Sequence, residues 1–243
     1  YDVNGNKYID FTSGIGVTVL GHANQELIRA AEEQLRKLWH ISIMVANYRP
    51  YVELAKKLAE IAPGSSEKQV ILQNSGSEAV DNAIKIARQA TSRFVVVSYE
   101  NSFHGRGTYG AALAATGKYS PYKTRLEPIA PGIELVPYPY CYRCPFKHEY
   151  PNCGLACLDY VRKWFTHTRV PPDRIAAFII EMVQGEGGFV VPPIDYVKEL
   201  KKFLEENDIL LIDDEVQSGW GRTGRMWAVE HFGVEPDIMV TAK

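Results

Sequence analysis

Short apolar segments that alternate with helix-like segments constrain the fold of this chain most strongly. Candidate strands lie at residues 70–72, 94–98, 176–180, 210–212 and 238–240. Candidate helices lie at residues 25–38, 51–61, 77–90, 158–167 and 196–206, where apolar residues follow a helical period. This alternation predicts an α/β fold with a mainly parallel sheet and helices on both faces. An Asn-Gly pair within residues 3–11 also predicts a β-hairpin.

Composition excludes several classes of protein. The 243 residues are 46% hydrophobic and 23% charged, which is an ordinary globular balance. The net charge of −2 indicates no general attraction to nucleic acid or to an anionic membrane. No run is long and apolar enough to span a bilayer, and no signal-peptide pattern is present, so we expect a cytoplasmic protein. The chain starts at Tyr1 within a strand-like segment and stops within a motif at Lys243, so we expect a segment of a longer protein.

Chemically distinctive residues follow the last two candidate strands. The first of these strands leads into Asp213 and Asp214, and the second leads into Lys243. Open α/β sheets place their sites at the carboxyl ends of strands. A lysine near an aspartate there suggests an amine that forms a Schiff base and a carboxylate that pairs with a pyridinium nitrogen. Taken alone, Lys243 would more often be a solvated surface charge.

A candidate anion site lies where residues 74–78, Asn-Ser-Gly-Ser-Glu, join a strand to a helix. A glycine-containing turn at a helix N-terminus presents free N–H groups and the positive end of the helix dipole to an anion. Ser77 could instead serve only as the N-cap of the helix. The residues of this turn therefore leave capping and phosphate binding both open.

These motifs together resemble the class III aminotransferases, a family that uses pyridoxal 5′-phosphate (PLP) and includes acetylornithine, ornithine and 4-aminobutyrate aminotransferases. The matching blocks are Ser-Gly-Ser-Glu at 75–78, Phe-His-Gly-Arg at 103–106, Glu-Met-Val-Gln-Gly-Glu-Gly-Gly at 181–188, Asp-Glu-Val-Gln at 214–217 and Gly-Trp-Gly-Arg-Thr-Gly at 219–224. The resemblance runs from Asp2 to Lys243, apart from one cysteine-rich segment. It implies the large domain of a fold-type-I PLP enzyme, with a mainly parallel sheet of the seven-stranded type.

The resemblance also implies a role for each matching residue. Lys243 would be the Schiff-base lysine and the catalytic acid and base, and Asp214 would be the catalytic partner of the ring nitrogen. The other cofactor contacts would be Gly76 and Ser77 at the phosphate, Phe103 and Val216 on the two ring faces, Gln217 at the phenolic oxygen and Glu181 in the supporting network.

Two further residues would face the substrate. Arg106 matches an arginine that binds the distal carboxylate of an ω-amino acid in some members, although Gly107 replaces the usual threonine. Glu186 would pair with an arginine beyond residue 243 that binds the α-carboxylate, and Met182 replaces the usual proline in its block. Residues near Ile15 would border the substrate entrance.

The function that the resemblance implies is PLP-dependent transamination of an amino acid or ω-amino acid of the 4-aminobutyrate or ornithine type. The acceptor would be 2-oxoglutarate, and the assembly would be a homodimer. The alternative is an amino-acid racemase or epimerase of the same family, which needs a second acid besides Lys243. Glu186 is a candidate for that acid, but racemases of this type are expected to carry aspartate there. A non-enzymatic zinc-organised module would leave the matching blocks unexplained.

The expected domain organisation follows the same resemblance. Residues 1–45 would form an N-terminal segment associated with the small domain, and residues 46–243 would form the PLP-binding large domain, which ends at the Schiff-base lysine. The rest of the small domain would lie outside this chain. A cysteine-rich insertion at 138–157 holds Cys141, Cys144, Cys153 and Cys157. Four such thiols could bind zinc, form two disulfides or remain reduced.

Overall fold

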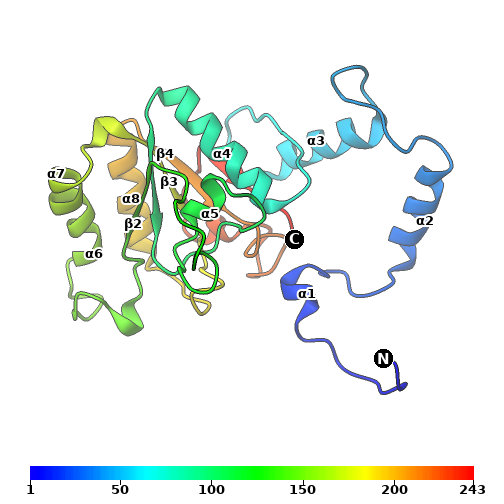
Figure 1. Cartoon of the computed structure of the whole chain (residues 1–243), viewed down its shortest axis with the longest axis horizontal. Coiled ribbons are helices and arrows are strands. Elements are labelled where there is room, and N and C mark those ends of the chain that lie inside the picture. The colour runs from blue at the N-terminus through cyan, green and yellow to red at the C-terminus, as the bar shows by residue number, and fades with distance from the viewer.

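A five-stranded, fully parallel sheet forms the centre of the computed structural model, which describes residues 1–243 (Figure 1). The strand order is β2-β1-β3-β4-β5. The strands are β1 (Val95–Tyr99), β2 (Ile133–Val136), β3 (Ile175–Ile180), β4 (Leu210–Asp214) and β5 (Ile238–Val240). The register places Ile180 beside Asp213 and Asp214 beside Val240. The parallel strands therefore carry their carboxyl ends to one edge.

Helices cover both faces of this sheet. The helices α4 (Gly76–Thr91) and α5 (Ala111–Ala115) pack on one face, against the side chains of residues such as Val96 and Ile179. The other face is covered by α8 (Ile194–Glu206) and by the continuous turns α6 (Ala156–Asp159), η2 (Tyr160–Phe165) and α7 (Thr166–Thr168). Every residue of β3 is buried, with Phe178 and Ile180 in the core of one face and Ala177 and Ile179 in the core of the other.

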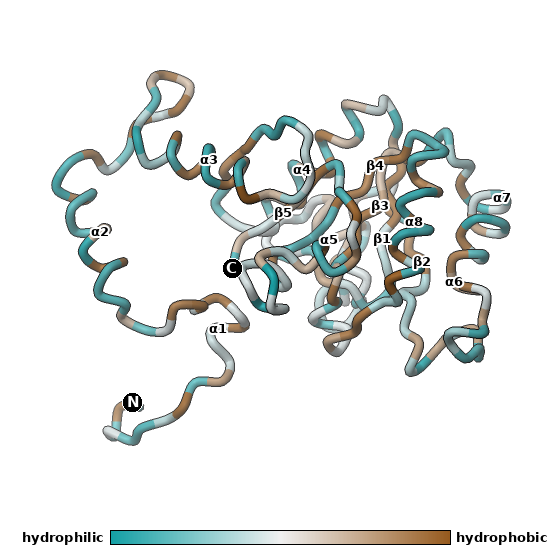
Figure 2. Tube along the Cα trace, turned by 180° about the vertical axis from the view of Figure 1, so that it is seen from behind, coloured by the Kyte–Doolittle hydropathy of each residue, from teal (hydrophilic) through white to brown (hydrophobic).

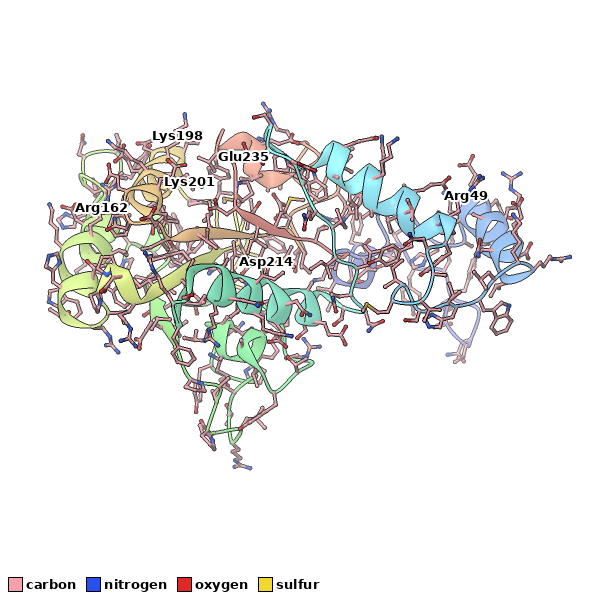
Figure 3. The ribbon with its side chains drawn as sticks, turned by 90° about the horizontal axis from the view of Figure 1, so that it is seen from above. Arg49, Arg162, Lys198, Lys201, Asp214 and Glu235 are labelled. Atoms are coloured by element: carbon pink, nitrogen blue, oxygen red, sulfur yellow. The ribbon has the colours of Figure 1, made fainter.

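The N-terminal part of the chain extends away from the sheet as an arm (Figures 1 and 2). It contains α1 (Ser13–Gly16), α2 (Gln25–Leu35) and α3 (Arg49–Ile61), and no residue before Val80 is buried. The end of α3 is tied to the body, where Trp227 Nε1 donates to Ile61 O at 2.6 Å and Ser66 Oγ donates to Glu235 at 2.5 Å (Figure 3). The assignment of residues 1–45 to the small domain stays a prediction.

The α/β fold with a parallel sheet between helices is confirmed, and four of the five candidate strands match β1, β3, β4 and β5. The strand predicted at 70–72 is wrong, because these residues form no ladder. The hairpin at 3–11 is also wrong. Asp2 Oδ1 accepts hydrogen bonds from the Asn4 and Asn6 amides at 2.9 Å each, so the Asn-Gly pair lies in a local Asx turn.

Other differences concern the number and length of elements. The sheet in this chain has five strands rather than seven, and β2 was not predicted because its four residues include Glu134 and only one is buried. The helix predicted at 158–167 is present but changes to a π-helical turn at Tyr160–Phe165. The short segments η1 (Cys141–Arg143), η3 (Pro172–Arg174) and η4 (Ala228–His231) are 3₁₀ turns. None of the helices has the length and hydropathy needed to cross a membrane.

Candidate active site

The candidate site lies at the edge where the strands end. Asp214 is the last residue of β4, Glu181 follows β3 directly, and Lys243 follows β5 after two residues. Figure 3 labels Asp214, which lies beside helix α4. The parallel register therefore brings together three residues that are far apart in the sequence, as expected for an open α/β sheet.

Asp214 is buried and held in a fixed orientation by two hydrogen bonds. One carboxylate oxygen lies 2.7 Å from Nδ1 of His104, and the other accepts the Val216 amide at 3.0 Å. Nε2 of the same imidazole is buried and has no partner. Sequence analysis gave His104 no role, so its contact with Asp214 is a feature that sequence reasoning missed. The signal was its position next to Phe103 in the Phe-His-Gly-Arg block.

Glu181 organises the loops around the site. Its two carboxylate oxygens accept hydrogen bonds from the amides of Phe103 at 2.9 Å and Gly185 at 3.0 Å. Burial raises the pKa of Glu181 to about 7. The nearby His104 opposes this shift, and the nearby Asp214 adds to it. The carboxyl group thus links the loop after β1 to the loop after β3 and sets the position of the Phe103 backbone.

Lys243 lies half-buried with its amine directed at a residue of the same site. Its Nζ donates to Gln217 Oε1 at 3.0 Å. Burial lowers the pKa of Lys243, whereas the nearby carboxylates of Asp214 and Glu181 oppose that shift. A lowered pKa increases the fraction of neutral amine, which is the form that attacks a carbonyl carbon.

In the first turn of α4, one serine caps the helix and another is left available for an anion. Ser75, rather than Ser77, is the N-cap, and its Oγ accepts the Glu78 amide at 3.2 Å. Ser77 Oγ is therefore not used for capping and accepts the Gly107 amide at 3.3 Å. A Cβ atom on Gly105, whose φ is +126°, would lie 2.5 Å from that Oγ, so this approach requires glycine. The helix N-terminus thus keeps N–H groups and a hydroxyl for an anion.

Gly76 belongs to the same turn and contacts Val216. A Cβ atom on Gly76 would meet the two γ-carbons of Val216 at 3.1 Å each. This close approach joins the anion-binding turn to the residue predicted to cover one ring face. The residue predicted for the opposite face, Phe103, contacts the Tyr122 ring edge-on, with ring centroids 5.0 Å apart.

The predicted substrate residues form a charged group at the side of the site. Glu186 Oε1 accepts from Lys118 Nζ at 2.7 Å and from the Tyr122 hydroxyl at 3.1 Å. The Lys118 hydrogen bond lowers the pKa of Glu186, so this side chain is a carboxylate at neutral pH. The Arg106 guanidinium lies 5.6 Å from the ring centroids of Phe103 and Tyr122. Sequence reasoning missed both Lys118 and Tyr122, because they lie in an irregular loop outside the matching blocks.

A cavity of about 310 Å³ connects the N-terminal arm to the site. The arm contributes residues that include Phe11 and Ile15, and the sheet domain contributes residues that include Gln217 and Arg222. Arg222 also donates to Gly16 O at 2.9 Å. The structure therefore places Ile15 on a cavity that reaches Gln217, which agrees with its expected position at an entrance.

The cysteine-rich segment lies outside this group. All four cysteines are free thiols, and Cys141 is exposed. No group of three or more His, Cys, Asp or Glu side chains is arranged to hold a metal ion.

Comparisons with known proteins agree with this geometry. The family model described as aminotransferase class-III matches residues 1–243. The chain is 40% identical to a probable 4-aminobutyrate aminotransferase of Bacillus subtilis and 42% identical to a leucine/methionine racemase of Thermococcus litoralis. Both alignments cover 100% of this chain, with 55% and 54% of the respective relatives. The chain thus spans about half the length of the curated relatives that it matches.

Solved structures show the same likeness. An (S)-enantioselective omega-transaminase from Thermomicrobium roseum superposes with a TM-score of 0.92 and 34% identity, over 100% of this chain and 55% of that one. An amine transaminase from an uncultivated Pseudomonas species, solved in its PLP-bound form, gives a TM-score of 0.91 and 29% identity over the same shares. This chain belongs to the class III aminotransferase family, whose cofactor is PLP.

The residues present fit that cofactor. Asp214 is an oriented, buried carboxylate for a protonated ring nitrogen, and the amine of Lys243 shares a hydrogen bond with Gln217. The first turn of α4 has an uncapped Ser77 hydroxyl near a helix N-terminus, as phosphate binding requires. Glu181 accepts the Phe103 amide and Asp214 accepts the Val216 amide, so these predicted residues belong to one network of contacts. The individual roles remain predictions.

Proposed function

We propose that the full-length protein catalyses PLP-dependent transamination of an amino acid or ω-amino acid. The observation that carries the proposal is the pair of adjacent strand ends, on which Asp214 is fixed by His104 and Lys243 carries an amine of lowered pKa. PLP, when bound, supplies an electron sink that stabilises negative charge at the substrate Cα. The residues of this chain supply position, charge and proton transfer.

Each residue then has a distinct task. Asp214 keeps a proton at the ring nitrogen, and His104 holds the carboxylate in the orientation that this requires. Lys243 Nζ would take the proton from the Cα of the donor and deliver it to the C4′ carbon of the cofactor, acting first as base and then as acid. Gly76 and Ser77 would hold the phosphate, Phe103 and Val216 would contact the ring, and Gln217 would donate to the phenolic oxygen.

The substrates we propose carry a carboxylate at a distance from the reacting amine. Arg106 lies exposed beside Phe103 and offers a planar, bidentate donor for such a group. The names of several relatives, 4-aminobutyrate aminotransferase of Escherichia coli and 5-aminovalerate aminotransferase of Pseudomonas aeruginosa, support donors of this type. The acceptor we propose is 2-oxoglutarate. We propose the homodimer and the substrate arginine beyond residue 243 on the family resemblance alone, and the cytoplasmic location stays an expectation from the sequence.

Racemisation is the second candidate, because one relative is named a leucine/methionine racemase. That reaction needs an acid on the side of Cα opposite to Lys243. Glu186 is unsuited to this task, since Lys118 and Tyr122 bind it and its lowered pKa keeps it ionised. The state of Glu186 therefore favours transamination.

The deciding experiment supplies the purified full-length protein and PLP with a panel of amino donors, with and without 2-oxoglutarate. We expect glutamate to form from 4-aminobutyrate or a related ω-amino acid only when 2-oxoglutarate is present. The Arg106→Lys variant should raise the KM for carboxylate-bearing donors more than it lowers kcat, because the bidentate contact is lost. Conversion of an L- to a D-amino acid without any keto acid would sink the proposal in favour of racemisation.

A further inference from the structure

The four cysteines have no part in the proposed chemistry, yet the fold gathers them in one place. All of them line a single cavity of about 20 Å³, and His148 and Tyr138 line it too. Cys141 lies at the start of the cysteine-rich segment, and Cys153 lies near its end. The segment therefore folds back on itself and places thiols from both ends at one small space.

Few backbone hydrogen bonds hold this segment in shape. Between β2 and α6 its only regular element is the three-residue turn η1. Local bonds join the Lys147 amide to Cys144 O at 3.1 Å and the Ala156 amide to Cys153 O at 3.2 Å. An outer contact joins the Tyr150 hydroxyl to Asp195 at 2.9 Å. A covalent link across the fold of the segment would restrain it where hydrogen bonds do not.

The thiols are not equivalent. Cys141 is exposed, whereas the other three are partly buried. Burial raises the pKa of Cys141, and the thiols of Cys153 and Cys144 raise it further. Burial also raises the pKa of Cys157 to about 12, with smaller contributions from Cys141 and Cys153. Cys141 is the most accessible of the four thiols, and Cys153 lies across the fold of the segment on the same cavity. Burial leaves Cys157 the least ready to form a thiolate.

We propose that Cys141 and Cys153 form a reversible disulfide that closes this segment over the cavity. The exposed Cys141 thiolate attacks a small-molecule disulfide such as oxidised glutathione, which forms a mixed disulfide and releases one small thiol. Cys153 then attacks the Cys141 sulfur and releases the second small thiol. The protein pair loses two protons and two electrons, and the small disulfide gains them. A metal centre is disfavoured, because no three of the ligating side chains are arranged to hold an ion.

The test uses the full-length protein in buffers of oxidised and reduced glutathione. Free thiols are blocked after unfolding and counted by mass, and peptide mapping identifies any linked pair. We expect the oxidised wild type to lose one pair of thiols, mapped to Cys141 and Cys153, and to recover both in reduced glutathione. The double variant Cys144→Ser/Cys157→Ser should still lose its pair, whereas the matched variant Cys141→Ser/Cys153→Ser should keep both of its thiols.

Circular dichroism shows whether each double variant is folded. If a variant is not folded, peptide mapping of the linked pair in the oxidised wild type tests the proposal by itself. Three results would overturn the proposal. They are the absence of thiol loss in oxidised glutathione, a linked pair other than Cys141 and Cys153, and one tightly bound zinc per chain that protects all four thiols.

Discussion

His104 shows how strongly a single side chain can determine a site. Its imidazole holds a buried carboxylate at 2.7 Å while its other nitrogen stays unpartnered. A buried hydrogen bond to a charged group contributes about 1–3 kcal/mol, and each 1.4 kcal/mol corresponds to a factor of about ten. We therefore propose that His104 is a positioning residue that would act on the cofactor through Asp214.

His104→Asn should lower kcat of the full-length enzyme by about 10- to 100-fold, because Asp214 loses its orienting partner. It should also shift the visible absorbance of bound PLP, which a purely structural role would leave unchanged. Steady-state kinetics and absorbance spectra measure both effects. His167→Asn, at an exposed position of α7, serves as the control. A variant with unaltered kcat and spectrum would show that Asp214 does not depend on this contact.

Glu181 makes the stability of the PLP-free protein depend on pH. Its folded-state pKa of about 7 lies above the ordinary value of 4.5. The folded protein therefore holds this proton more tightly than the unfolded chain does. The stabilisation is fully present below about pH 4.5 and is lost as the pH rises through 7.

In Glu181→Gln this pH dependence of the free energy of unfolding should be missing. Between about pH 4.5 and 7 the wild type should lose at most about 3 kcal/mol of stability that the variant does not lose. Urea unfolding at a series of pH values gives the free energy of unfolding for both proteins. Glu206→Gln, which changes an exposed carboxylate on α8, should retain the wild-type slope. Parallel profiles for wild type and Glu181→Gln would contradict the raised pKa.

At the scale of single elements, α4 assigns separate tasks to two serines. Ser75 caps the helix, and the Glu78 side chain returns to the Asn74 amide at 2.9 Å, as in a capping box. Ser77 faces the loop that contains Gly105 and Gly107. The sequence predicted the helix, but it named Ser77 as the possible N-cap and missed Ser75, which is an equally good N-cap residue.

The two serines give a matched pair of variants. Ser75→Ala should lower the free energy of unfolding by about 1 kcal/mol, because an N-cap bond is lost. Ser77→Ala should instead weaken PLP binding, with a smaller change in stability. Urea unfolding and PLP titration followed by absorbance separate the two effects. The assignment would be reversed if Ser77→Ala lowered the free energy of unfolding more and Ser75→Ala weakened PLP binding more.

Across the whole molecule, the sequence predicts the buried strands well and the irregular segments poorly. The strand β3 is an uninterrupted apolar run and β4 begins with one at Leu210–Ile212, so their positions and their parallel pairing were predictable. The edge strand β2 was not, because an edge strand needs only a short, partly polar segment. The motif residues at the strand ends were found through the family resemblance. Lys118 and Tyr122 lie outside the matching blocks, so only the tertiary contacts reveal them. His104 lies inside a matching block, but its contact with Asp214 also required the tertiary structure.

The central claim is that one cofactor site is built from the ends of β3, β4 and β5, with Lys243 as its covalent anchor. Borohydride reduction of the full-length protein with PLP, followed by peptide mapping, tests it most directly. We predict that the phosphopyridoxyl group is found on Lys243 alone and that Lys243→Ala loses both the label and the visible absorbance. A label on another lysine, or retention of the label and absorbance in Lys243→Ala, would contradict the assignment.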